Sequence, residues 1–91
     1  MPERTVVVGS RSGLHARPAA LFVRAAAGQP VPVRIRAGNG RTADTRSILA
    51  VLALKVDHGD TVTLEAEGGE DGAADQALDA LVALLEKDLD E

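Results

Sequence analysis

Two stretches of the chain alternate between apolar and polar positions. Residues 31–37 do so, and residues 61–66 repeat the pattern. A period of two is typical of a β-strand with one buried face. The β-branched residues of 5–8, ended by Gly9, predict another strand. Gly38-Asn39-Gly40 is a turn signal, so we expect residues 41–44 to return as a hairpin partner of the second strand. Pro32, near the start of that strand, indicates an edge strand or a bulge.

Three other stretches have helical spacing. Apolar residues at positions 19, 22, 23 and 26 predict a helix that begins at Ala16 and stops at Gly28. Ser47 is a good N-cap for a short helix over 48–54. After a turn at 57–60 and a glycine-rich loop at 68–72, an apolar stripe predicts a terminal helix, formed by Ala74, Leu78, Leu81, Leu85 and Leu89.

The predicted order of elements is βαββαβα. Strands mixed with helices, without a repeated βαβ unit, favour an α+β fold of two layers. We expect an antiparallel sheet with helices on one face and water on the other. At 91 residues, the chain is expected to form a single domain over 1–91.

Composition excludes several functions. The chain has no cysteine, one aromatic residue (Phe22) and a formal net charge of −4. Disulfides and thiol chemistry are therefore excluded, and base stacking on aromatic side chains is too. A small RNA-binding α+β domain is disfavoured for the same reasons. Because the N-terminus has no signal-like layout and the longest uncharged apolar run is only 48–54, we expect a cytoplasmic protein with no membrane insertion.

The charges are distributed unevenly. Residues 1–46 carry eight arginines and two acids, a net charge of +6, whereas residues 47–91 carry two lysines and twelve acids, a net charge of −10. A basic half on an acidic protein suggests a small anionic ligand or an acidic protein partner. Ordinary solvated surface charge is the alternative.

The stretch Gly13-Leu14-His15-Ala16-Arg17-Pro18-Ala19 could carry chemistry. His15 lies where a loop meets a helix start, and the first N–H groups of a helix have no partner within it. These N–H groups and the helix dipole favour an anion, and the Arg17 guanidinium can fork onto phosphate oxygens. An imidazole at this place can accept and pass on a phosphoryl group. The alternative is that His15 is a cap or a surface residue.

The same stretch resembles the active-site signature of the HPr family, the histidine-containing phosphocarriers of the bacterial phosphoenolpyruvate-dependent sugar phosphotransferase system. A second stretch, Arg46-Ser47-Ile48-Leu49-Ala50-Val51-Leu52, resembles that family's regulatory serine segment. With the order of elements, the resemblance covers essentially the whole chain. It implies an open-faced β-sandwich of four antiparallel strands covered by three helices.

The resemblance implies a carrier without cofactor or metal, not an enzyme that turns over a small molecule alone. His15 would accept the phosphoryl group on Nδ1 from phospho-Enzyme I and pass it to EIIA domains of sugar permeases. Arg17 would stabilise the phosphate, together with the backbone N–H groups of Ala16 and Arg17. Partners would dock on the first two helices, at Ala20, Arg24, Ala27, Ile48, Leu49 and Leu52. Because the second helix is apolar all round, some of its apolar surface must be exposed. The resemblance implies that Leu49 and Leu52 are exposed, and the alternative for both is packing in the core.

Ser47 allows further hypotheses. In some family members this serine is phosphorylated by an HPr kinase/phosphorylase, which slows phosphorylation by Enzyme I and creates a corepressor for a transcription regulator. A phosphate there would add about −2 charge to the docking surface. The alternatives are thus a Ser47-phosphorylated corepressor module, or a nitrogen-type or dihydroxyacetone kinase-linked paralogue that uses the same His15 and Arg17. A carrier that meets several partners in turn is expected to be a monomer. His58, in an acidic turn, has too few neighbouring ligands for a metal and is expected to be a surface residue.

Overall fold

The computed structural model describes residues 2–67 and 72–87, and for Ala16 its backbone only. Within these residues four strands form one antiparallel sheet, in the order β1-β4-β2-β3. The strands are β1 (Glu3–Val7), β2 (Val33–Arg36), β3 (Thr42–Asp44) and β4 (Thr61–Ala66). The stretch 61–66 is thus a strand over its predicted length, and the strand predicted at 5–8 begins and ends earlier.

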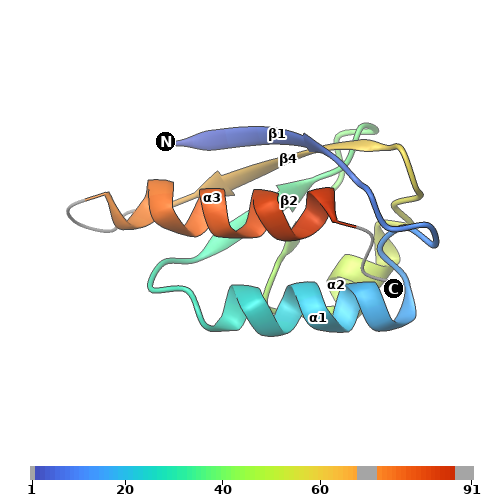
Figure 1. Cartoon of the computed structure of the whole chain (residues 1–91), viewed down its shortest axis with the longest axis horizontal. Coiled ribbons are helices and arrows are strands. Elements are labelled where there is room, and N and C mark those ends of the chain that lie inside the picture. The colour runs from blue at the N-terminus through green and yellow to red at the C-terminus, as the bar shows by residue number, and fades with distance from the viewer. Residues whose placement is uncertain (1, 68–71, 88–91) are drawn as a thin grey trace.

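The helices lie on one face of this sheet, as Figure 1 shows. They are α1 (Ala16–Ala27), α2 (Ile48–Ala53) and α3 (Ala73–Glu86). α3 packs on β1 and β4, α1 contacts both other helices, and α2 contacts β3. The fold is therefore an α+β open-faced sandwich, as predicted. No helix among the described residues is both long and apolar enough to cross a membrane.

The core lies between the sheet and the helices. In β4 the apolar residues Val62, Leu64 and Ala66 are buried, while the intervening residues point to the outer face. The helices supply the other side of the core, with Phe22 of α1 fully buried. The period-two pattern therefore identified the buried face correctly, because each inward side chain meets a helix.

Pro32 does not mark an edge strand: β2 pairs with β4 on one side and β3 on the other, and Pro32 lies just before it. A proline is tolerated there because the ladder begins one residue later. Leu89, the last position of the predicted apolar stripe, and Gly68 and Gly69 of the predicted loop lie outside the described residues.

The loop that leads into α1 lies tightly against the segment that leads into β4. The N–H of Leu14 donates to the Val56 carbonyl at 2.9 Å, and the Leu14 side chain is fully buried. Gly13 has φ +70°, and a Cβ at this position would lie 2.3 Å from the Val56 oxygen and 2.6 Å from the Asp57 Cα. Only glycine fits this conformation and this close approach. The start of α1 is therefore held beside residues 56–57.

Candidate functional site

His15 is the N-cap residue of α1. Its backbone is extended, with φ −122° and ψ 156°, and its side chain makes no capping hydrogen bond. The imidazole is 41% exposed, and its Nε2 lies 3.4 Å from Oδ1 of Asp57. The ring is therefore accessible from solvent and not packed into the core.

The first turn of α1 offers open donors beside this ring. The helix begins at Ala16, so the N–H groups of Ala16 and Arg17 have no acceptor within the helix. Pro18 follows and has no N–H to leave unpaired. The first turn contains no acidic residue. An anion at this end would meet the first N–H groups of the helix and the positive end of the helix dipole.

Arg17 stands next to these donors. Its side chain is exposed, and among the described residues it makes no hydrogen bond or ion pair. Three arginines of the chain's basic half, Arg4, Arg36 and Arg46, differ in this respect: Arg4, for example, pairs with Asp75 at 3.0 Å on α3. The Arg17 guanidinium is therefore free to turn toward an incoming anion.

Asp57 also lies at this site, although the sequence pattern predicts only a turn for residues 57–60. Its backbone N–H donates to Oδ2 of Asp60 at 2.9 Å, and its carbonyl accepts from the Asp60 N–H at 3.1 Å. The turn is thus fixed, and its Asp57 carboxylate faces His15. Periodicity cannot show this contact, because it joins residues 42 positions apart. The signal available was Gly13, the first residue of the motif, because a glycine can mark a close backbone approach.

Ser47 caps α2 as predicted. Its Oγ accepts a hydrogen bond from the Ala50 N–H at 3.3 Å, and its backbone N–H donates to the Asp44 carbonyl. The side chain is half-buried. The hydroxyl already has a structural function in the unmodified protein.

The side chains expected to dock partners are mostly exposed. On α1 these are Ala20, Arg24 and Ala27. On α2, which contacts α1, Leu49 is 78% and Ile48 37% exposed. The expected exposure of Leu52 is wrong, because this side chain is half-buried and packs against the core. An apolar helix of this length still turns one face to the sheet, and Leu52 lies toward that face.

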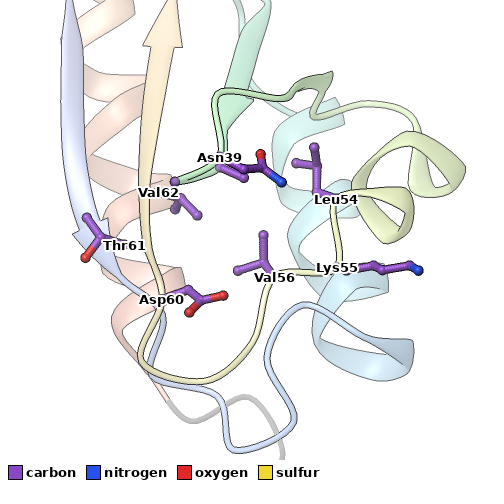
Figure 2. Close-up of a pocket in the computed structure, with 9 residues that line it drawn as sticks. Asn39, Leu54, Lys55, Val56, Asp60, Thr61 and Val62 are labelled. Carbon is purple, nitrogen blue, oxygen red and sulfur yellow. The ribbon is translucent and has the colours of Figure 1, made fainter.

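A pocket of about 340 Å³ lies elsewhere, between the β2–β3 turn and residues 54–62 (Figure 2). The Val56 side chain points into it, whereas the Lys55 side chain extends away. Neither His15 nor Arg17 lines it. His58 is exposed in its turn, and the described part of the chain contains no cluster of three or more metal-binding side chains.

Known proteins are similar to this chain in sequence and in fold. Residues 2–87 match the family model described as "PTS HPr component phosphorylation site". A phosphocarrier protein HPr from Streptomyces coelicolor is 44% identical, over all of this chain and 95% of the relative. An HPr-like protein Crh from Halalkalibacterium halodurans is 36% identical, over 97% of this chain and all of the relative.

Solved structures agree with these relatives. The crystal structure of an HPr from Bacillus anthracis has a TM-score of 0.84 and 34% identity, and the match covers 92% of this chain and 95% of that one. The Bacillus subtilis protein Crh, crystallised as a swapped dimer, has a TM-score of 0.72 and 34% identity, with 97% of both chains covered. With its family match over nearly the whole sequence and its four-stranded open-faced fold, the chain belongs to the HPr family of phosphocarrier proteins.

Proposed function

We propose that this chain, acting as one domain over residues 1–91, accepts a phosphoryl group on Nδ1 of His15 from phospho-Enzyme I and passes it to EIIA domains of sugar permeases. The observation that carries the proposal is the position of His15. Its imidazole is 41% exposed and makes no capping hydrogen bond at the N-terminus of α1, and it lies next to an Arg17 side chain that has no partner among the described residues.

The residues of the site have distinct roles in this transfer. The Nδ1 lone pair attacks phosphorus, the bond between phosphorus and the donor breaks, and the electron pair of that bond stays on the donor. The N–H groups of Ala16 and Arg17 and the Arg17 guanidinium hold the phosphoryl oxygens. Transfer to the acceptor reverses these steps, so the protein is a covalent intermediate and needs no cofactor.

Docking completes the proposal. Partners would contact the exposed residues of α1 and α2, with Leu49 as an apolar contact and the Arg24 and Arg17 side chains at its rim. A basic rim favours acidic partners and speeds their encounter. The exchange takes place in the cytoplasm with the carrier as a monomer, because the same surface must meet donor and acceptor in turn.

The test uses labelled phosphoenolpyruvate and Enzyme I. We expect label that is stable to alkali and labile to acid, and that is lost in His15→Ala. His58→Ala, which removes the other histidine from an exposed turn, is the matched control and should keep the label. Label that persists in His15→Ala would contradict the proposal.

A regulatory function is the second candidate. The similarity to the HPr-like protein Crh and the presence of Ser47 at the N-terminus of α2 favour it. A corepressor module alone would not need His15 and Arg17 at one site, so we rank it below the carrier. Label that requires ATP and a kinase, and that is lost in Ser47→Ala, would support it. A nitrogen-type or dihydroxyacetone kinase-linked carrier would keep the His15 label and differ in its acceptor, which a transfer assay with each acceptor would show.

A further inference from the structure

The two ring nitrogens of His15 have different surroundings. Nε2 lies 3.4 Å from Oδ1 of Asp57, which comes from the turn before β4. An ionised carboxylate only accepts hydrogen bonds, so a hydrogen bond between these two atoms requires a proton on Nε2. We propose that Asp57 is a positioning residue for His15: its carboxylate binds Nε2–H and keeps the lone pair of the neutral ring on Nδ1. This inference rests on the proposed function of His15 as a phosphoryl acceptor.

The backbone that carries the Asp57 carboxylate is held in place from several directions. Gly13 and Leu14 bring residues 56–57 against the loop that ends at His15. The turn is closed by the two hydrogen bonds between Asp57 and Asp60. It is also tied to the end of β1, because the Val8 N–H donates to the Asp60 carbonyl at 2.9 Å and the Val8 carbonyl accepts from Gly59 at 3.0 Å. The backbone therefore fixes where Asp57 stands relative to His15.

This arrangement has a consequence for phosphoryl transfer. The Nδ1 lone pair forms the new bond to phosphorus, and the electron pair of the bond that breaks stays on the donor. The proton on Nε2 remains in place, so the ring of phosphorylated His15 gains positive charge. The Asp57 carboxylate stabilises that charge from the edge of the ring opposite the phosphoryl group. No proton has to enter or leave during the transfer.

Asp57 also acts against the wrong product. A phosphoryl group on Nε2 would bring its anionic oxygens to the side of the ring where the carboxylate lies. The negative charges of the phosphoryl oxygens and of the Asp57 carboxylate would then repel each other. The same residue that exposes the Nδ1 lone pair therefore disfavours phosphorylation of Nε2.

The expected effect on rate is moderate. The His15 side chain is 41% exposed and that of Asp57 76%, so water screens the interaction. An exposed ion pair is worth up to about 1 kcal/mol, which corresponds to a factor of about five in rate. Asp57 is therefore expected to tune the reaction, whereas His15 itself is indispensable to it.

The test compares Asp57→Asn with wild type. The amide has the shape of the carboxylate without its charge, and it can donate as well as accept. In nitrogen-15 spectra of the unphosphorylated proteins, we expect the neutral His15 ring of wild type to be protonated on Nε2, and that of Asp57→Asn to be a mixture of both tautomers. The control is Glu67→Gln, which removes one exposed carboxylate at the end of β4 and should leave the wild-type spectrum of His15 unchanged.

A transfer measurement completes the test. In single-turnover transfer from saturating phospho-Enzyme I, we expect Asp57→Asn to be slower by a factor of about five and Glu67→Gln to be as fast as wild type. An unchanged tautomer, or an unchanged rate despite a changed tautomer, would overturn the inference. If wild type took no label on His15, the proposed function would fail instead, and the spectra of unphosphorylated protein would still decide whether Asp57 orients the ring.

Discussion

The N-termini of α1 and α2 solve the same problem in opposite ways. Each helix leaves N–H groups without partners at its start. At α2, Ser47 accepts from the Ala50 N–H and so satisfies one of them within the chain. At α1, His15 holds the N-cap position and makes no capping hydrogen bond. The first arrangement stabilises the helix, and the second places the first N–H groups of α1 beside the imidazole that we propose as the phosphoryl acceptor.

The cause of the difference lies in the cap residues and in what supports them. A serine cap contributes about 1 kcal/mol to stability, and a histidine that does not cap gives up that contribution. The start of α1 is held by tertiary contacts instead, because Gly13 and Leu14 pack against residues 56–57. Functional sites often sacrifice local stability in this way. The difference between the two helix starts can be tested by giving α1 a capping residue and by removing that of α2.

The largest effect is expected when the α1 start is given a real cap. His15→Ser places a hydroxyl at a residue whose extended backbone suits an N-cap. We expect transfer from Enzyme I to be abolished and the free energy of unfolding to rise by less than about 1 kcal/mol, because Pro18 has no N–H and only that of Arg17 is left for the hydroxyl to cap. Urea unfolding and the labelling assay measure the two effects. A loss of stability would show that His15 supports the helix start in a way the geometry does not reveal.

The next largest effect concerns the arginine beside the open donors. Arg17→Glu reverses the charge that meets the phosphoryl oxygens, so we expect transfer to slow by about a hundredfold or more. The fold should persist, because the side chain is exposed and has no partner among the described residues. Arg41→Glu, an equal charge change in the exposed β2–β3 turn, is the control and should transfer normally. Equal rates in the two variants would remove Arg17 from the site.

A charge at the α2 start should have a smaller effect. Ser47→Asp keeps a capping oxygen and adds a negative charge close to exposed Ile48 and Leu49. We expect the docking surface of Enzyme I to be acidic. The KM of Enzyme I for the carrier should therefore rise severalfold, while the free energy of unfolding stays near that of wild type. The effect should weaken as salt is added, since screening reduces repulsion between exposed charges. A rise that is independent of salt would argue against electrostatic repulsion.

The smallest effect is on stability alone. Ser47→Ala removes the capping oxygen of α2 and should lower the free energy of unfolding by about 1 kcal/mol. His15→Ala removes no cap and should lower it less. Urea titrations of both variants give the difference directly. Equal losses would mean that the two helix starts do not differ as described.

Much of the fold could be predicted from the sequence because its elements are marked locally. The alternation of residues 61–66, the spacing of buried positions in α1 and the Ser47 cap each depend on residues close together in the chain. The strand order could not be read from such patterns. β2 became an inner strand although Pro32 pointed to an edge, because pairing is decided by which segments meet in three dimensions.

The candidate site also contains residues that could be predicted from local sequence and one that could not. His15, Ala16 and Arg17 form a contiguous motif at a helix start, so their proximity followed from the sequence. Asp57 did not, because only the fold brings its turn to His15. Leu52 was expected at the surface and is half-buried, since a helix that is apolar all round does not show which of its faces will meet the core.

The most direct test of the account is to find where the phosphoryl group resides. The protein, labelled with nitrogen-15, is phosphorylated by phosphoenolpyruvate and Enzyme I and then compared with the unmodified form by NMR. We predict phosphorus bonded to Nδ1 of His15, with the largest amide shifts at Ala16 and Arg17 and small ones at the start of α2. Phosphorus on Nε2 of His15 or on any other residue, or the largest shifts at the start of α2, would contradict the account.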